Sequence, residues 1–305
     1  MSNLIDQSNL ILEDREWELL LRRIRDGKCT PFLGAGACYG ILPLGSDIAR
    51  SWAKEYDYPM DDVYDLPRVA QYLSVQYDSM YPKEELIKDF FSDNKVPDYA
   101  DPDEPHGILS GLPLPVYLTT NYDSFMVQAL EAAGKQPQRE YCRWNESIKY
   151  NPSIFDDASY QPDPHNPVVF HLHGLDKVPE SLVLTDDDYL DFLINVSKDQ
   201  NLLPHLIQRA MAGSSLLFIG YSLEDWTFRV LFRGLVNATE SALRRISVAV
   251  QLPPDAPEST QRLIQKYRNM YFDKIDIRIH WGNSRDFVQE LSARWDTFKA
   301  EKGDG

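Results

Sequence analysis

Cysteine is scarce in this sequence. Cys29, Cys38 and Cys142 are its only cysteines among 305 residues, and no two of them form a Cys-x-x-Cys pair. That spacing argues against a zinc site built from four cysteines and against a disulfide scaffold. We therefore expect no metal, and the composition fits a reducing cytoplasm.

Long apolar runs and positive charge are lacking as well. No run approaches the roughly 20 apolar residues that a membrane helix needs, and residues 1–6 lack the basic and apolar regions of a signal peptide. The net charge is −16, from 31 Lys and Arg against 47 Asp and Glu. Such a surface repels nucleic-acid phosphates, and the basic residues of 22–25 are typical of a solvated helix face. We expect no membrane partner and no direct nucleic-acid partner.

The sequence does contain short apolar segments that alternate with helical patterns. Hydrophobic residues make up 43% of the chain, which is enough for a large core. We expect strands just before Gly34 and at residues 116–120, 168–172, 182–184, 215–220, 246–251 and 275–281. Uninterrupted apolar strands between helices favour a parallel sheet covered on both faces. The sequence thus predicts one α/β, Rossmann-like domain over residues 1–305.

Two helical regions lie outside this alternation. Residues 11–26 are predicted to form an amphipathic helix, because Trp17, Leu20, Leu21 and Ile24 recur at spacings of three and four. Residues 57–110 carry no strong strand, and we expect a helical insertion there with helices at 63–77 and 83–91. The insertion could be packing material, a lid or a subunit contact. Both regions offer apolar faces beyond what one sheet covers, so we expect a homo-oligomer.

Polar clusters follow four of the predicted strands. They comprise residues 34–36, residues 121–123, His173 and residues 221–225. Parallel sheets bind ligands at the carboxyl ends of their strands. We therefore expect the four clusters to converge on one crevice.

The first cluster is the turn Gly34-Ala35-Gly36. A strand that ends in Gly-x-Gly before a helix presents backbone N–H groups and a positive helix end to a diphosphate. The next glycine is Gly40, which is one residue away from the usual dinucleotide spacing. This stretch alone also fits a strand-to-helix turn that binds nothing.

The second and third clusters supply an amide and two imidazoles. The carboxamide of Asn121 can accept and donate hydrogen bonds together, which suits it to orient a water or a ribose hydroxyl. Asp123 could cap the following helix. His171 and His173 share one side if the strand reaches both, but no third ligand has metal spacing. His173 suits a general base near neutral pH, and His171 better fits a structural role.

The fourth cluster ends another apolar strand. Ser222 could donate to a ribose or phosphate oxygen. Asp225 could either join the site or cap a helix that starts near Trp226.

Taken in order, Gly-Ala-Gly, Thr-Thr-Asn-Tyr-Asp, Leu-His-Gly and Gly-Tyr-Ser are far more specific than any one of them. Through this set the chain resembles the sirtuin-like superfamily, and it looks most similar to bacterial sirtuin-like NAD hydrolases of antiphage defence. The resemblance covers roughly residues 25–297. It implies diphosphate contacts at Gly34, Ala35 and Gly36, Asn121 beside the nicotinamide ribose, Asp123 near the nicotinamide, His173 as the catalytic histidine, and Gly220 and Ser222 near the adenosine ribose.

Two differences from the deacylating sirtuins bear on which reaction of NAD we expect. Those enzymes carry four zinc-binding cysteines and a Pro-Asp-Phe-Arg stretch, whereas residues 41–47 here read Ile-Leu-Pro-Leu-Gly-Ser-Asp. The resemblance therefore favours cleavage of NAD into nicotinamide and ADP-ribose. The alternatives are a zinc-free protein deacylase and a non-catalytic sensor of NAD or ADP-ribose. The resemblance also implies a bacterial cytoplasmic effector of abortive infection, controlled by a HerA-like ATPase or another phage-sensing partner.

Overall fold

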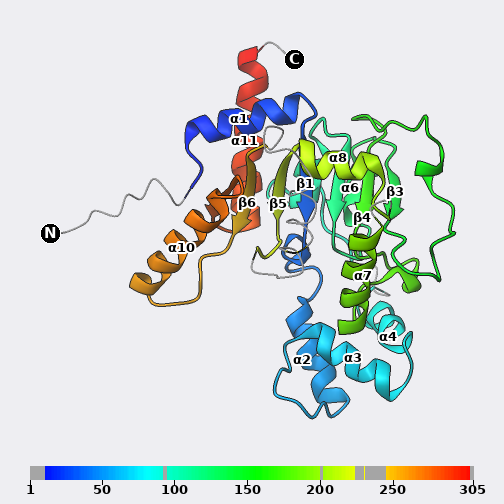
Figure 1. Cartoon of the computed structure of the whole chain (residues 1–305). Coiled ribbons are helices and arrows are strands. Elements are labelled where there is room, and N and C mark those ends of the chain that lie inside the picture. Colours follow the sequence, from blue (N-terminus) through cyan, green and yellow to red (C-terminus); the bar gives the residue numbers. More distant parts are fainter. Residues whose placement is uncertain (1–10, 92–94, 200–201, 224–229, 231–244, 303–305) are drawn as a thin grey trace.

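The computed structural model describes residues 11–91, 95–199, 202–223, 230 and 245–302, and its centre is a sheet of seven parallel strands (Figure 1). The strand order is β3-β4-β2-β1-β5-β6-β7. The strands are β1 (Cys29–Leu33), β2 (Val116–Thr119), β3 (Gln138–Tyr141), β4 (Val168–His171), β5 (Ser215–Ile219), β6 (Ser247–Gln251) and β7 (Ile277–Trp281). Every pairing is parallel, so the predicted α/β, Rossmann-like sheet is confirmed.

Helices cover both faces of the sheet, as predicted, because successive residues of each strand point to opposite sides. Phe32 and Leu118, which are paired across β1 and β2, pack in one core, and Leu33 packs in the other. The first core lies under α7 (Asp186–Lys198), α8 (His205–Gly213) and α10 (Glu258–Asp273), and the second under α1 (Asp14–Arg25), α6 (Phe125–Ala132) and α11 (Ser284–Lys302). None of the helices in the described ranges combines the length and the apolar character that crossing a bilayer requires.

The first helix, α1, confirms the amphipathic pattern near the N-terminus. Its buried residues are Trp17, Leu20, Leu21 and Ile24, which are the residues that define the predicted apolar face. Gly27 follows with a φ of 62° and turns the chain into β1.

One strand was missed, and one predicted strand is absent from the described residues. The edge strand β3 went unnoticed because its sequence is Gln-Arg-Glu-Tyr and its first two residues are exposed. Conversely, residues 182–184 are fully buried but form no strand. The Val183 N–H donates to the carbonyl of His173, and the hydrogen-bonding edge of β4 is already occupied by β2 and β3. Burial of an apolar triplet therefore did not require a place in the sheet.

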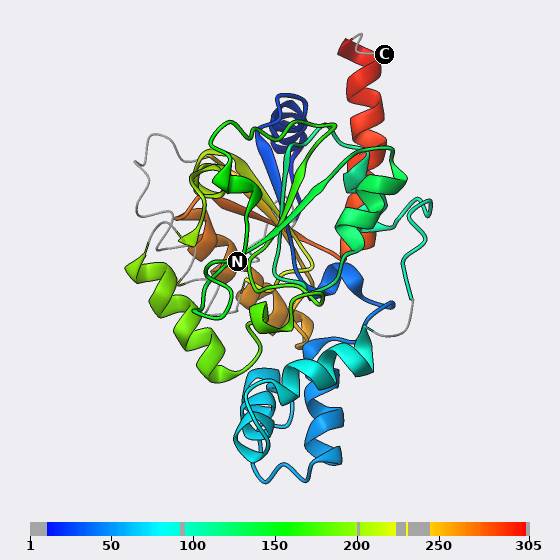
Figure 2. The same cartoon turned by 90° about the vertical axis from the view of Figure 1, so that its right-hand side faces the viewer.

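The insertion forms a separate group of helices at one end of the molecule (Figure 2). It comprises α2 (Gly45–Glu55), α3 (Leu66–Gln76) and α4 (Tyr81–Phe90), which share a core around Trp52 and Leu73. This group begins before residue 57, and α5 (Pro105–Ser110), at the end of the expected insertion, instead packs against α6 and α11. The ion pair between Lys83 of α4 and Asp188 of α7, at 3.0 Å, ties the group to the sheet layer.

Candidate active site

The strand order fixes where a ligand site is expected. From β1 the chain moves to β2, then to the edge strand β3 and back to β4 between them, all on one side, and later returns through β5 to the other side of β1. Open α/β sheets bind ligands outside the carboxyl ends of the strands at such a switch point. The turns after β1, β2 and β5 meet there.

The two glycine turns pack directly against each other. The N–H of Gly34 donates to the carbonyl of Ile219 at 3.0 Å, and the N–H of Gly36 donates to the carbonyl of Gly220 at 2.8 Å. A Cβ on Gly34 would lie 2.6 Å from the Gly220 carbonyl oxygen, and one on Gly220, whose φ is 68°, would collide with the amide of Ala37. These glycines are therefore required by turn-against-turn packing, whether or not a ligand is bound.

This packing bears on the predicted diphosphate contacts. The amides of Gly34 and Gly36 already have carbonyl partners within the protein. Ala35 is the exposed residue of the turn, whereas Gly34 is buried. Of the three residues, Ala35 is thus the most exposed.

Asn121 is held from three directions at the end of β2. Its Nδ2 donates to the carbonyl of Gly34 at 3.1 Å and to the sulfur of Cys38 at 3.2 Å. Its own N–H donates to the hydroxyl of Thr119 at 2.9 Å, and its carbonyl accepts from Nδ1 of His171 at 3.0 Å. Both Nδ2 hydrogens are used, so the side-chain oxygen is the atom left to accept a hydrogen bond from a water or a hydroxyl.

The two histidines of the third cluster have different surroundings. Strand β4 ends at His171, so His173 lies in the following turn and the condition for a shared side is not met. His171 is buried, and burial lowers its pKa although the Asn121 carbonyl acts in the opposite direction. His173 contacts the rings of Tyr189 and Phe192 on α7, edge to face, with centroids 5.3 and 5.2 Å away. His171 makes a hydrogen bond to the backbone of Asn121, and His173 packs against the aromatic rings of α7.

Asp123 hydrogen-bonds to the first residue of the following helix and also joins a buried polar group. Its Oδ1 accepts from the N–H of Phe125, the first residue of α6, at 2.9 Å. Its Oδ2 accepts from the thiol of Cys38 at 3.2 Å. Burial raises the pKa of this thiol well above its ordinary value, and the Asp123 carboxylate raises it further. Asp123 thus bonds the first amide of α6 from the position before the N-cap, Ser124, and its second oxygen has a role that the sequence did not indicate.

The sequence did not indicate two further residues that lie behind Asp123 and Cys38. His106 and Glu104 lie at the start of α5, where Nδ1 of His106 is 2.7 Å from Oε1 of Glu104 and both side chains are buried. Burial alone would raise the pKa of Glu104, but the hydrogen bond from His106 lowers it below its ordinary value. The sequence Glu-Pro-His sits in a stretch rich in Pro and Asp that is typical of a loop, and nothing local to it indicates that it faces Cys38.

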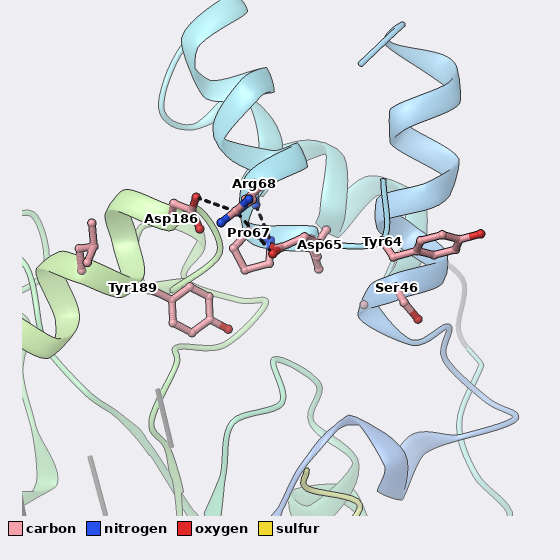
Figure 3. A pocket seen from close by; sticks show the side chains of 10 residues that line it. Ser46, Tyr64, Asp65, Pro67, Arg68, Asp186 and Tyr189 are labelled. Carbon is pink, nitrogen blue, oxygen red and sulfur yellow. Dashed lines mark hydrogen bonds and ion pairs between the residues drawn. The ribbon is translucent and has the colours of Figure 1, made fainter. Parts of the chain in front are cut away.

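A cavity of about 730 Å³ lies between the insertion and α7 (Figure 3). Its lining includes Ser46, Tyr64, Arg68, Asp186 and Tyr189. Arg68 pairs with Asp65 at 3.6 Å and with Asp186 at 4.0 Å. Tyr189 also contacts His173, so this ring connects the cavity wall with the predicted catalytic histidine.

The fourth cluster is fixed by the neighbouring strand. Gln251, the last residue of β6, donates from Nε2 to the carbonyl of Tyr221 at 2.7 Å and accepts from the N–H of Leu223 at 3.2 Å. Ser222 between them is exposed. Asp225, for which two roles were open, lies outside the described residues.

Three of the four predicted clusters are therefore in direct contact. Gly34 hydrogen-bonds to Asn121, and the first turn packs on Gly220. The remaining cluster, His173, borders the cavity wall through Tyr189 and is joined to Asn121 by the chain segment that contains His171.

The fold and the site define a doubly wound α/β protein whose polar and glycine-rich turns gather at the switch point of a parallel sheet. Within that class the chain belongs to the SIR2-like domain family, whose model matches residues 115–272.

Named relatives agree with this assignment. The chain is 28% identical to the NAD(+) hydrolase ThsA of Cytobacillus dafuensis over 207 residues, which is 67% of this chain and 37% of that protein. It is 26% identical to defense-associated sirtuin 2 of Bacillus subtilis, over 89% of this chain and 25% of that protein. A solved structure described as "Structural Basis for the Mechanism and Regulation of Sir2 Enzymes" aligns with 94% of this chain and all of its own, at 10% identity and a TM-score of 0.39.

The chain spans little more than a third of the ThsA relative and a quarter of the sirtuin relative. The weak structural match carries no argument, so the fold assignment rests on the sheet of this chain itself.

Proposed function

We propose that the protein hydrolyses NAD+ to nicotinamide and ADP-ribose. The observation that carries the proposal is the direct contact of the Gly34, Asn121 and Gly220 turns at the switch point. The similarity to proteins named NAD(+) hydrolase ThsA supports the same reaction.

The reaction breaks the bond between the nicotinamide nitrogen and C1′ of the ribose. An oxocarbenium-like state forms at C1′, as in other glycoside hydrolyses, and water supplies the new C–O bond. Nicotinamide leaves as a neutral molecule with the electron pair of the broken bond, so no strong acid is required. One proton of the water is released.

Asn121 and His173 are the proposed catalytic residues. The side-chain oxygen of Asn121 would accept a hydrogen bond from the attacking water or from a ribose hydroxyl, since its Nδ2 is already held by Gly34 and Cys38. The imidazole of His173 would orient that water or accept its proton, a role worth roughly 10²–10⁴-fold in rate. His171 fixes the backbone of Asn121 and would act only through it.

Substrate binding is proposed at the surrounding turns. The diphosphate would lie over Gly34, Ala35 and Gly36, with Ala35 exposed. Asp123 would lie near the nicotinamide, and Gly220 and Ser222 near the adenosine ribose. The proposed catalytic step uses no metal, so a chelator should leave folding, and the cleavage rate of protein that carries no bound metal, largely unchanged.

The biological setting is part of the same proposal. The relative named defense-associated sirtuin 2 supports a role in bacterial antiphage defence, in which NAD depletion in the cytoplasm would cause abortive infection. A homo-oligomer and a HerA-like ATPase or other phage-sensing partner would supply control. Sedimentation at micromolar concentration tests the oligomer, because an active, strict monomer would contradict it.

The decisive assay is incubation with NAD alone. We expect release of nicotinamide and ADP-ribose without any acylated peptide, in the presence of the activating partner if one is required. Turnover that depends on an acetyl-lysine peptide and yields O-acetyl-ADP-ribose would instead identify a deacylase. Binding of NAD without turnover under every activating condition would identify a sensor.

A further inference from the structure

Three metal-ligating atom types meet behind Asn121. The sulfur of Cys38, a ring nitrogen of His106 and a carboxylate oxygen of Asp123 all lie within 4.8 Å of one another, and all three residues are buried. They come from the end of the 3₁₀ turn after β1 (Ala35–Cys38), from α5 and from the turn before α6. No sequence spacing connects them, so only the fold brings them together.

A second feature, the contact between Glu104 and His106, indicates that this group can bind a cation. Glu104 accepts a hydrogen bond from Nδ1 of His106 at 2.7 Å. A carboxylate at Nδ1 fixes the proton there and leaves the lone pair on Nε2, which is the arrangement found behind histidine ligands of zinc. Glu104 itself is held by the N–H of Gly107.

We propose that Cys38, His106 and Asp123 form a regulatory site for a zinc-like divalent cation. Zinc takes thiolate, imidazole and carboxylate ligands at about 2.0–2.3 Å, which separates ligands in a tetrahedron by roughly 3.3–3.8 Å. Sγ of Cys38 and Oδ2 of Asp123 are already 3.2 Å apart. The ring nitrogen of His106 lies within 4.8 Å of both atoms, and small side-chain rotations would bring all three ligands to the metal. Water would take the fourth ligand position.

The binding step balances by loss of one proton. The thiol of Cys38 now donates to Asp123, and this proton passes to the buffer as the sulfur becomes a thiolate ligand. His106 enters as the neutral imidazole, and Asp123 exchanges its hydrogen bond from sulfur for a bond to the metal.

The consequence for activity rests on the proposed NAD hydrolysis. Nδ2 of Asn121 donates to the same sulfur, and Asp123 lies two residues further along the chain. A cation that moves the Cys38 sulfur and the Asp123 carboxylate from 3.2 Å apart to the wider ligand separation of a tetrahedron displaces this amide. A misplacement of about 1 Å can cost 10²-fold in rate, so zinc should inhibit cleavage by at least about tenfold.

Metal binding is tested without NAD. Zn²⁺ is titrated against a chromogenic chelator, and Co²⁺ serves as a spectroscopic probe of a sulfur ligand. The wild-type protein should bind one equivalent and show a thiolate-to-cobalt charge-transfer band. Cys38→Ser should abolish that band and weaken zinc binding at least about tenfold, because a hydroxyl is a poor zinc ligand. Cys142→Ser is the matched control: its buried thiol faces the carbonyl of Leu202, so this variant should bind like wild type.

The outcomes separate the site from the enzyme activity. Equal zinc affinity in wild type and Cys38→Ser, or no cobalt–sulfur band in wild type, overturns the site. If Cys38→Ser fails to fold, His106→Gln replaces it and should weaken zinc binding to the same extent. Zinc inhibition is then measured within each active variant as the ratio of rates with and without metal. Specific zinc binding that leaves this ratio at one overturns the regulatory role but not the site, and an inactive protein that still binds zinc contradicts only the proposed function.

Discussion

Replacing Gly34 by alanine tests whether the glycine turn is shaped by the protein or by its ligand. The new Cβ would lie 2.6 Å from the Gly220 carbonyl oxygen and 2.8 Å from the Tyr221 Cα. Both neighbours are backbone atoms that cannot rotate away. Gly34 has a φ of −126°, so alanine adds no dihedral strain and the effect is purely steric. Overpacking of this kind costs about 1–3 kcal/mol.

The net effect includes the unfolded chain. Glycine-to-alanine changes stabilise by about 0.4–1 kcal/mol through the unfolded state, which leaves a loss of about 1–2 kcal/mol. For 305 residues, an unfolding entropy of about 2.1 cal/mol/K per residue converts this loss to a fall in Tm of about 2–3 °C.

The matched control is Gly213→Ala at the end of α8, where a Cβ would meet nothing within 4 Å. This variant should melt at or slightly above the wild-type temperature, since only the unfolded-state term applies. Both are compared by calorimetry or circular dichroism without NAD. If Gly34→Ala melts like wild type and loses only NAD affinity, the turn-against-turn packing is not what requires this glycine.

Two further predictions concern stability. Lys83→Met should lower the free energy of unfolding in urea by about 1–3 kcal/mol, because it removes the partner of the nearly buried Asp188. Lys88→Met removes a largely exposed lysine from an ion pair on the same helix and should cost much less, and equal losses would contradict the docking role of Lys83. Burial lowers the pKa of His171 and His280, so stability should fall as the pH drops below about 6.5. An unchanged urea midpoint between about pH 7.5 and about pH 5.5 would refute this.

The sequence predicted the elements whose apolar pattern is continuous and missed those whose role depends on position. Strands β1, β2, β4 and β5 are buried at every residue, so their composition alone marked them. Strand β3 lies at the sheet edge with two exposed residues, and its polar sequence carries no comparable signal.

The site residues differ in the same way: those that directly follow a strand were predicted, and those brought in by helix packing were not. Gly34, Asn121 and Gly220 were predicted to converge because each follows a strand of a parallel sheet, and they are in contact. The buried pair Glu104–His106 could not be predicted, because it reaches Cys38 and Asp123 only through the packing of α5 on α6. The sequence also did not predict that the N–H groups of Gly34 and Gly36 donate hydrogen bonds to the carbonyls at the end of β5 and in the turn after it.

The rate of nicotinamide release by Asn121→Ala and His173→Ala tests the central proposal most directly. Each protein is first shown to be folded by circular dichroism and to bind NAD by calorimetry. We predict that turnover falls at least about 10²-fold in both variants, whereas NAD affinity changes far less, because the turns at Ala35 and Gly220 remain. Near-normal release of nicotinamide by folded His173→Ala would contradict the proposed catalytic centre, and with it the sirtuin-like mechanism.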